Sequence, residues 1–427
     1  MGKIRIPIYG FVHYDEKEED IMNSFFFLRL RNIKQLSLTS YVYPGATHTR
    51  FEHSLGVMEI ASKMFDSLLS KPNYKEKIQN SLQGIGIDLN TAKTILRLSA
   101  LMHDVGHLPF SHSAENSILP KGKKHEDVSV AVIVSQRDTL EKLYSKEIID
   151  AICQIIGNQP IISELKLLRN IISGSIDADR TDYLIRDSYH CGVDYGSFDY
   201  NRLIESLTVV DSSTDGLELS IDEDGVHALE ALIMARYYMF AQVYFHKTRR
   251  IYDYYLRNFM QKWQSEFGKD ILNILNEDDV SVWQNLRMEA IDTNSDYYGI
   301  ARRILKRKNH SVILSSEYSN KIVTRKTDKV HDVIEKNNPE LDFWIDSDSV
   351  KIHDFYSDGD EDGEELMITK GTKEILLTTY SAIFKKMPKK FAICRLYAAQ
   401  REDAEKIEKC KLDKLIEQAE ELEGSVK

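Results

Sequence analysis

Apolar residues recur at helical spacing along most of the first 267 residues of the chain. Between Phe51 and Phe65 they keep to one face of a helical period, which predicts a helix over 50–69. A second stretch of this kind predicts a helix over 91–105, and Gly106 ends it. The same pattern predicts further helices over 21–36, 125–136, 145–156, 162–174 and 178–190.

The pattern changes after residue 206 and again after about residue 270. Two apolar runs, 207–210 and 217–221, flank a polar turn and predict a β-hairpin. The aromatic-rich stretch 226–267 predicts a long helix or a helix pair. Strand-like runs then alternate with charged helices, at 311–314, 349–355, 366–369 and 391–397. An acidic turn over 358–365 and a charged C-terminal helix complete the prediction.

These patterns predict a mainly α fold with two parts. The first is a helical core with a small β-hairpin, residues 1–267, and the second is a C-terminal α+β lobe, residues 268–427. The 8 prolines and 20 glycines among 427 residues agree with this prediction, because an all-β chain full of tight turns uses more of both.

Charge and cysteine content restrict the function and the compartment. The net charge of −11 argues against a surface that coats nucleic acid, although it leaves room for a local basic pocket. The 4 cysteines form no C-x-x-C pair, which disfavours a zinc-thiolate site and indicates a reducing compartment. No apolar stretch has the length of a signal peptide or a membrane span. We therefore expect a cytoplasmic protein that does not contact membranes.

Histidines cluster in the first part of the chain, where six of the 13 lie between residues 48 and 125. His53, the adjacent pair His103 and Asp104, and Asp179 stand out among the candidate ligands. Two imidazoles and two carboxylates suit a divalent metal of borderline softness, and such a metal activates bound water. The His-Asp pair also lies on an otherwise apolar helix, where buried polar groups need partners.

Three other interpretations of these residues are weaker. His103 and Asp104 could form a structural hydrogen-bonded pair. His103 and His107 have the spacing of a zincin motif, but an Asp replaces its Glu and Gly106 stops the helix. The run from Asp177 imitates the start of a calcium loop, yet its sixth position holds an Asp instead of the required Gly.

Three long motifs resemble a known family. They are Tyr43-Pro-Gly-Ala-Thr-His-Thr-Arg-Phe-Glu-His-Ser-Leu-Gly, Leu101-Met-His-Asp-Val-Gly-His-Leu-Pro-Phe-Ser-His and Asp177-Ala-Asp-Arg-Thr-Asp-Tyr-Leu-Ile-Arg-Asp. In order and spacing they are similar to the deoxynucleoside triphosphate triphosphohydrolases of the SAM-and-HD-domain type, within the HD-domain phosphohydrolase superfamily. The resemblance covers roughly residues 1–265 and implies a helical HD-domain core with its motif region at about 48–190.

The resemblance implies a role for each matching residue. The metal ligands would be His53, His103, Asp104 and Asp179. The catalytic group would be His112 as the acid, Glu115 as its support, His107 beside the phosphates, and His125. The phosphate-binding residues would be Arg50, Arg180, Arg236 and Lys247. The nucleoside would meet Gln35 and Leu36 at the deoxyribose, Tyr183 and Asp187 at the 3′-hydroxyl, and Tyr244 at the base.

The implied reaction converts a dNTP and water to a deoxynucleoside and inorganic triphosphate. It needs a positioned hydroxide, neutralisation of negative charge and a proton donor. The metal at the HD site could be Mn, Fe, Zn, Co or Ni, and Mg would accompany the substrate phosphates. For Tyr244 the sequence leaves base stacking and core packing equally open, and for His125 a structural role is the alternative.

The resemblance also bears on partners. Activator-regulated relatives carry an Asp and a Gln that read a guanine, whereas Asn23 and Leu28 stand at those positions here and only Arg31 persists. This difference argues for a constitutive enzyme or for another nucleotide activator. A homo-oligomer, dimer or tetramer, is expected, with a regulatory or oligomerisation role for residues 268–427, and nucleic-acid binding is not expected. The alternatives are another HD-domain reaction, by a nuclease, a nucleotidase or a modified-nucleotide hydrolase, or a non-catalytic nucleotide binder.

Overall fold

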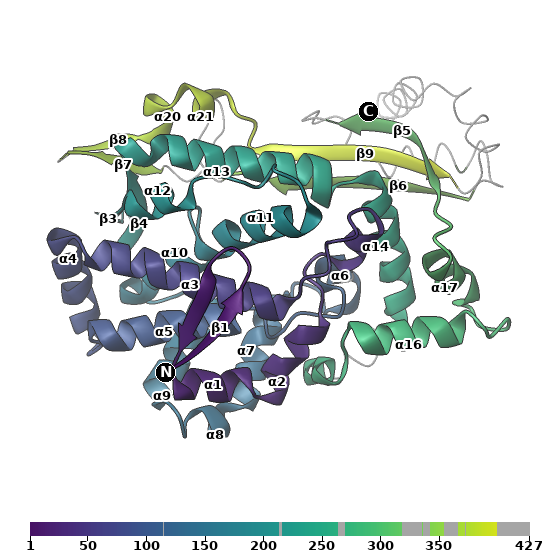
Figure 1. The fold of residues 1–427 in the computed structure, drawn as a ribbon, viewed down its shortest axis with the longest axis horizontal. Coiled ribbons are helices and arrows are strands. Elements are labelled where there is room, and N and C mark those ends of the chain that lie inside the picture. The colour runs from purple at the N-terminus through teal and green to yellow at the C-terminus, as the bar shows by residue number, and fades with distance from the viewer. Residues whose placement is uncertain are drawn as a thin grey trace, which may run out of the picture.

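The computed structural model describes residues 1–113, 115–212, 216–263, 270–317, 335, 342–353, 366–371 and 373–398. The acidic turn predicted over 358–365 and the predicted C-terminal helix lie outside these residues. Within them the fold is mainly α, as predicted (Figure 1). None of the described helices combines the length and the apolar character that crossing a bilayer requires.

Helix α3 (Arg50–Leu69) lies at the centre of the core, with the bounds predicted from its apolar period. It packs against α5 (Leu89–Met102) and α11 (Ala178–Cys191), which correspond to two other predicted helices. Asp88 and Asp177 cap these two helices, because each side chain accepts a hydrogen bond from a backbone amide of the first turn. The three helices bring together the parts of the chain that carry the sequence motifs.

The other helices of the core surround these three. They are α4 (Pro72–Gln83), α6 (Glu115–Ile118), α7 (His125–Ser135), α8 (Arg137–Leu140), α9 (Lys146–Ile156), α10 (Lys166–Ile172) and α12 (Tyr200–Glu205), with the short turns η3 (Ser111–Ser113) and η4 (Ser163–Leu165). Helices were predicted at the positions of α7, α9 and α10, and these predictions are confirmed.

The single helix predicted over 21–36 was wrong. The chain forms α1 (Glu16–Met22), α2 (Phe25–Leu28), η1 (Arg29–Asn32) and η2 (Ser37–Tyr41) instead. A capping box between Asp15 and Glu18 starts α1 before the predicted position. Ser24 then bonds the Ile21 carbonyl through its hydroxyl and interrupts the helix.

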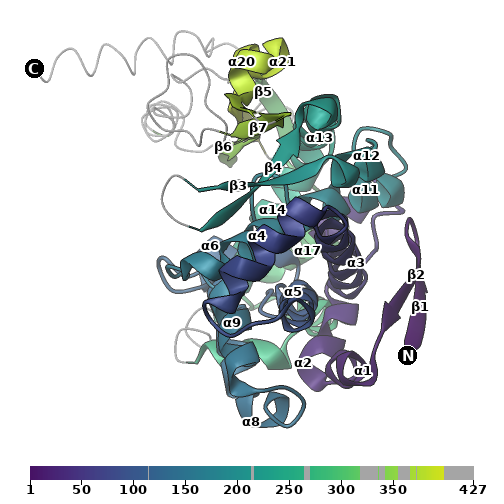
Figure 2. The ribbon, with the colours of Figure 1, turned by 90° about the vertical axis from the view of Figure 1, so that its left-hand side faces the viewer.

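The N-terminal strands β1 (Gly2–Ile6) and β2 (Gly10–Tyr14) form an antiparallel hairpin. Figure 2 shows this hairpin on the outside of the helical core, beside α3. A second hairpin, β3 (Leu207–Asp211) and β4 (Leu217–Asp222), confirms the predicted one. It shares a sheet of order β3-β4-β7-β8 with β7 (Met367–Lys370) and β8 (Lys373–Leu376), and β4 and β7 run parallel.

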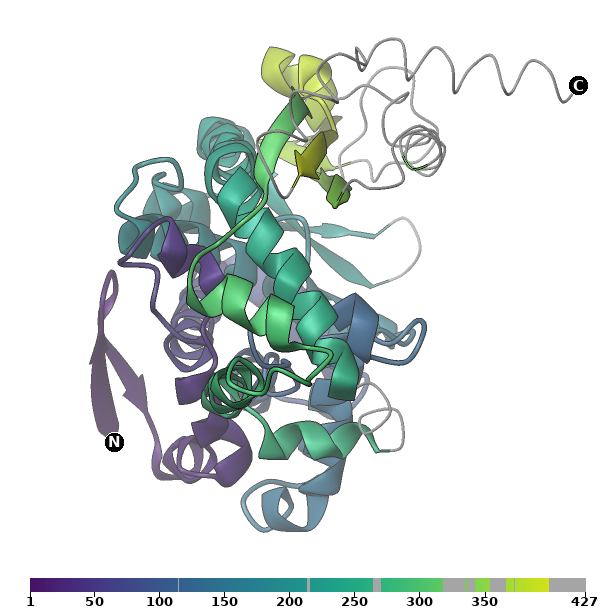
Figure 3. The same ribbon diagram turned by 90° about the vertical axis from the view of Figure 1, so that its right-hand side faces the viewer.

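The predicted aromatic helix pair is α13 (Val226–Met239) and α14 (Lys247–Met260), joined by the π-helical turn η6 (Phe240–Tyr244). The turns η5 (Glu223–Gly225) and η7 (Gln261–Trp263) flank the pair. After it come η8 (Ile271–Asn276), α16 (Asp279–Glu289) and α17 (Tyr298–Leu305). Figure 3 shows α16 and α17 beside α14.

A second sheet has the order β5-β9-β6 and is antiparallel throughout. Its strands are β5 (Ser311–Glu317), β6 (Phe343–Lys351) and β9 (Lys390–Ala398), and α20 (Leu377–Tyr380) and α21 (Ala382–Lys386) precede β9. The strand predicted over 349–355 begins earlier, at Phe343, and ends at Lys351. The division into domains at residue 267 stays a prediction.

Candidate active site

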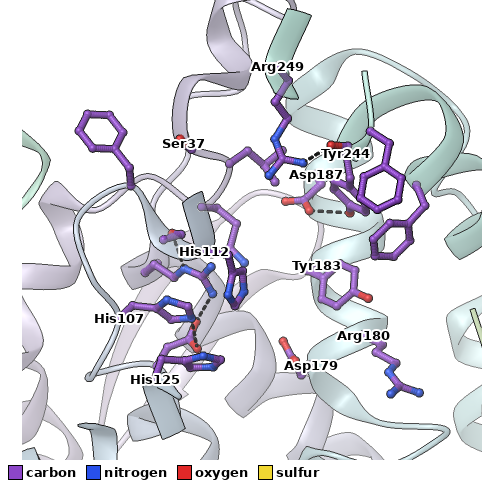
Figure 4. Close-up of a pocket in the computed structure, with 18 of the residues that line it drawn as sticks. Ser37, His107, His112, His125, Asp179, Arg180, Tyr183, Asp187, Tyr244 and Arg249 are labelled. Carbon is purple, nitrogen blue, oxygen red and sulfur yellow. Dashed lines mark hydrogen bonds and ion pairs between the residues drawn. The ribbon is translucent and has the colours of Figure 1, made fainter. Parts of the chain in front are cut away.

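A cavity of about 420 Å³ opens where the three motif-bearing segments meet the α13–η6–α14 elbow (Figure 4). Thirteen of the predicted site residues line it, namely Gln35, Leu36, Arg50, Asp104, His107, His112, His125, Asp179, Arg180, Tyr183, Asp187, Arg236 and Tyr244. His53, His103 and Glu115 contact these residues. Lys247, the first residue of α14, is not among the residues that line the cavity.

The four predicted metal ligands converge from three elements at the inner end of the cavity. His53 Nε2 lies 3.0 Å from Asp179 Oδ1 and 3.6 Å from Asp104 Oδ2. His103 Nε2 lies 3.3 Å from Asp104 Oδ1 and 3.8 Å from Asp179 Oδ1. Ligand atoms at about 2.1 Å from one tetrahedral or octahedral ion have separations of this size.

The donor atoms of this cluster fit a divalent cation. The Nε2 atoms of His53 and His103 are buried, and neither has a partner in hydrogen-bond geometry. Burial disfavours a charge on His53, but Asp179 and Asp182 outweigh it and raise the pKa of His53 to about 10. The carboxylates thus attract a positive charge to this point, and a metal ion would supply it in place of the proton.

A group of buried residues behind His53 holds its ring in position. Asp182 Oδ2 lies 2.8 Å from His53 Nδ1, and both oxygens of Asp182 accept hydrogen bonds from Arg186. Arg186 is wholly buried and also bonds Glu52. The pKa of Asp182 is held well below its usual value because Arg186 and His53 outweigh the effect of burial. The residues orienting a metal-bound histidine act in this way.

No role was predicted for this buried group. Asp182, three residues after Asp179 on α11, was considered only as a position in a calcium loop. Residues three and seven positions apart lie on one helical face, so Asp179, Asp182 and Arg186 could have been placed together. Glu52 comes from α3, and no local spacing predicts that contact.

His107, His112 and His125, three residues of the predicted catalytic group, lie on one wall of the cavity (Figure 4). Glu115 Oε2 lies 2.7 Å from His112 Nδ1, and Glu115 Oε1 lies 3.0 Å from His125 Nδ1. These imidazoles hold the pKa of Glu115 well below its usual range despite its burial. Burial opposes the protonation of His125, but Glu115 outweighs it and raises its pKa. His107, His112, Glu115 and His125 lie close enough together to hold an ion, although hydrogen bonds already satisfy the Glu115 carboxylate.

The surroundings of His107 favour its neutral form. Its ring is stacked on His125, with ring centroids 3.9 Å apart, and is fully buried. Burial, together with the charges of Arg50 and His125, lowers the pKa of His107 well below its usual value. His107 is therefore a neutral imidazole, able to donate or accept one hydrogen bond next to a substrate.

The opposite wall carries the residues predicted to meet the nucleoside. Asp187 Oδ1 lies 2.7 Å from His48 Nε2, and Asp187 Oδ2 accepts a hydrogen bond of 2.7 Å from the Tyr244 hydroxyl. Burial and the Asp187 charge raise the pKa of Tyr244 well above its usual value, so its hydroxyl stays protonated. Tyr244 ends the π-helical turn η6, a feature often found at functional sites.

Arginine side chains bring positive charge to the cavity. Arg236 donates to the Tyr183 hydroxyl at 2.6 Å and to the Lys351 carbonyl at 2.9 Å. Arg50 donates to Asp104 Oδ2 at 2.7 Å, so it lies beside the metal cluster. Arg180 and Arg249 also line the cavity. Such planar donors suit phosphate oxygens, which is the role predicted for Arg50, Arg180 and Arg236.

The sequence matches two families over most of the described core and lobe. One, the HD domain, matches residues 50–187, and the other, the HD associated region, matches residues 198–407. A solved structure of a hypothetical protein from Aquifex aeolicus is 33% identical, with a TM-score of 0.76, and the match covers 94% of this chain and 98% of that chain.

Curated proteins are also similar to this chain in sequence. An uncharacterized protein of Methanocaldococcus jannaschii is 38% identical over 303 residues, 70% of this chain and 59% of that protein. The deoxynucleoside triphosphate triphosphohydrolase SAMHD1 homolog of Dictyostelium discoideum is 31% identical over 250 residues, 56% of this chain and 45% of that protein. The chain thus spans about half the length of the curated relatives it matches.

Proposed function

The chain belongs to the HD-domain phosphohydrolase superfamily, and we propose that it hydrolyses dNTPs to a deoxynucleoside and inorganic triphosphate. One observation carries the proposal. Two predicted metal ligands, Asp104 and Asp179, line the same cavity of about 420 Å³ as His112, several arginines and a Tyr-Asp pair, and His53, His103 and Glu115 contact these lining residues. The similarity to the SAMHD1 homolog of Dictyostelium discoideum supports the choice of substrate.

The metal cluster would generate the nucleophile. A divalent cation held by His53, His103, Asp104 and Asp179 would make hydroxide available near neutral pH. Asp104 is held ionised, since its pKa lies well below the usual value because Arg50 and the neighbouring histidines outweigh its burial. The ion pair with Asp104 keeps Arg50 beside both the metal cluster and the position where the α-phosphate would lie.

His112 would protonate the leaving 5′-oxygen of the nucleoside. Its side chain is 58% exposed towards the cavity, and Glu115 holds it through Nδ1, which leaves Nε2 for the substrate. The Glu115 carboxylate fixes the orientation of the His112 ring, and an acid in this position would donate its proton from Nε2. His107, being neutral, adds no competing positive charge at this point.

The opposite wall would bind the rest of the substrate. Arg180 and Arg236 would neutralise the triphosphate, whose charge is about −4, and their planar donors match its oxygens. Asp187 and Tyr183 would accept and donate hydrogen bonds at the 3′-hydroxyl. Leu36 lies on the same cavity and would crowd a 2′-hydroxyl, which favours deoxyribonucleotides. Phe240 and Phe245 add apolar surface near Tyr244 for the base.

The decisive experiment identifies the products. The purified protein is incubated with each dNTP and with Mn²⁺ and Mg²⁺, and the products are separated by ion exchange. We expect deoxynucleoside and intact triphosphate, loss of activity with a chelator and recovery when metal is restored. Asp104→Ala should abolish turnover, whereas Asp138→Ala, which removes an exposed carboxylate of α8, should leave it unchanged.

The same assay separates the proposal from other HD-domain reactions. Release of pyrophosphate or orthophosphate from dNTPs would contradict it. Degradation of single-stranded DNA without dNTP turnover would indicate a nuclease, and turnover confined to nucleoside monophosphates would indicate a nucleotidase.

A further inference from the structure

A buried carboxylate from the predicted C-terminal lobe bonds two chain segments whose residues line the cavity. Asp279, the first residue of α16, is 3% exposed. Its Oδ1 accepts a hydrogen bond of 2.6 Å from the Phe110 amide, and its Oδ2 accepts one of 3.0 Å from the Lys34 amide. Asp279 is not among the residues that line the cavity, so it acts on the two chain segments and not on a substrate.

Both segments carry residues assigned to the site. The Lys34 amide is followed directly by Gln35 and Leu36, and the Phe110 amide is followed closely by His112. The deoxyribose-facing side chains and the proposed acid therefore depend on the backbone that Asp279 holds. No side chain of the core itself bonds these two amides in the described part of the chain.

The backbone of these segments is unusual. Among the described residues five that are not glycine have a positive φ, and three of them, Ser37, Phe110 and Ser111, lie here with φ of 50°, 57° and 57°. Residues other than glycine adopt this left-handed region only at a cost, and they keep it where surrounding contacts determine it. The hydrogen bonds that Asp279 accepts from the Lys34 and Phe110 amides are contacts that hold the backbone of these segments.

Further hydrogen bonds connect the two segments to the metal cluster. The Ser111 hydroxyl donates to the Lys34 carbonyl at 2.8 Å, and Arg50 Nε donates to the Ser111 hydroxyl at 3.0 Å. Arg50 in turn donates to Asp104 Oδ2 at 2.7 Å. A continuous series of hydrogen bonds thus runs from α16 to a predicted metal ligand.

Helix α16 is itself held firmly against the core. Asn32 donates to Asp278 Oδ2 at 2.9 Å, and Arg29 Nε donates to the Glu277 carbonyl at 2.5 Å. Trp283 packs its ring edge-on against Phe110, with ring centroids 5.8 Å apart. The carboxylate of Asp279 therefore starts from a fixed position.

We propose that Asp279 is a positioning residue of the active site, which fixes the sugar-facing segment 34–37 relative to the acid-bearing loop 110–113. The region after residue 268 thereby completes the site instead of only covering it. The expected effects on turnover and sugar preference rest on the proposed function. The anchoring of the two backbone amides is independent of the proposed function.

Asparagine at this position tests the inference with almost no change of shape. Its side chain offers one carbonyl oxygen, so it can accept from one of the two amides, and its NH₂ group would face the other. Asp270→Asn is the matched control. It removes the same charge from an exposed N-cap, that of η8, which bonds neither of the two segments, and asparagine caps a helix about as well as aspartate.

The first measurement is hydrogen–deuterium exchange of full-length protein, read on peptides that contain the Lys34 and Phe110 amides. We expect faster exchange at both amides in Asp279→Asn and no change in Asp270→Asn. The second is kinetics with a dNTP and the matching ribonucleotide. We expect Asp279→Asn to keep its bound metal, to lose at least about tenfold in kcat, and to lose at least about fivefold of its preference for the deoxyribonucleotide.

Contrary results are easily recognised. A folded, metal-loaded Asp279→Asn with kcat and sugar preference within twofold of the parent would overturn the inference, as would unchanged exchange at both amides. If this variant does not fold, it is replaced by Ser111→Ala, which removes the hydrogen bond to the Lys34 carbonyl. An unchanged sugar preference in Ser111→Ala then overturns the inference. If the parent protein cleaves no dNTP, the proposed function fails, and the exchange data alone decide whether Asp279 anchors the two segments.

Discussion

His53 illustrates how a single side chain at this site depends on its second ring nitrogen. Its Nε2 faces the metal cluster, whereas its Nδ1 lies 2.8 Å from Asp182, which Arg186 holds from the other side. A neutral imidazole binds a metal through the nitrogen that carries no proton, so the contact at Nδ1 selects the useful tautomer. Asp182 would therefore support metal binding at His53 without itself being a ligand.

We predict that Asp182→Asn lowers the affinity for Mn²⁺ by about 10- to 100-fold, the usual effect of losing such an orienting contact. The asparagine can still accept from His53, but it loses its charge and part of its hold on Arg186. The measurement is a competition titration against a fluorescent chelator. Asp199→Asn, at the exposed N-cap of α12, is the control and should bind metal as the parent does.

The sequence predicts the ligands of such a site better than their supports. His53, His103, Asp104 and Asp179 were predicted from residue types and motif order, and in the structure each of the two histidines lies within 3.8 Å of both carboxylates. Contacts such as Glu52 to Arg186, or His48 to Asp187, join residues more than a hundred positions apart. Neither helical period nor local motif contains that information, which depends on how two helices cross.

At the scale of elements, the crossing of α3 and α11 sets the geometry of the metal cluster. α3 supplies His53 and α11 supplies Asp179, and Gly56 on α3 allows the two helices their close approach. A methyl group at Gly56 would lie 1.9 Å from Asp182 Oδ1 and 2.3 Å from an Arg186 nitrogen. Both side chains are buried and bonded to each other, so they have no free space to move into.

We predict that Gly56→Ala destabilises the protein by about 1–3 kcal/mol, the usual cost of overpacking, although alanine favours a helix. Because the inserted methyl would push α11 away, metal affinity should fall together with stability. The control is Gly299→Ala on α17, where nothing lies within 4 Å, and it should be neutral or slightly stabilising. Thermal unfolding and metal titration of both variants test this prediction. Equal stability and equal metal affinity of the two variants would contradict it.

The accuracy of the element predictions also has a physical basis. The apolar period of α3 continues without interruption between its two ends, and its prediction was confirmed to the residue. The helix predicted over 21–36 was wrong because side chains overrode its period, through the capping box at Asp15 and the Ser24 hydroxyl bond. Strand β6 was predicted too far along, since its N-terminal half does not alternate apolar and polar residues and is paired with β9, a strand distant in the sequence.

At the scale of the whole molecule, the β5–β9–β6 sheet supports the elbow that forms one wall of the cavity. Arg250 on α14 makes a two-point ion pair with Asp346 on β6, at 3.0 and 2.5 Å. Arg236 donates to the Lys351 carbonyl on β6, and Arg395 on β9 donates to the Phe245 carbonyl. The α13–η6–α14 elbow is thus held from the C-terminal side of the chain.

This arrangement predicts that core and C-terminal sheet unfold as one cooperative unit. Asp346 is 1% exposed, so Asp346→Asn leaves the Arg250 charge without its buried partner, at a cost of about 3–5 kcal/mol. Asp348 pairs with the same arginine but its side chain is 44% exposed, so Asp348→Asn should cost at most about 1 kcal/mol. Scanning calorimetry should show a single transition that Asp346→Asn moves to lower temperature as a whole and that Asp348→Asn barely moves. Two separate transitions, with only one affected by Asp346→Asn, would mean that the sheet folds independently of the site it supports.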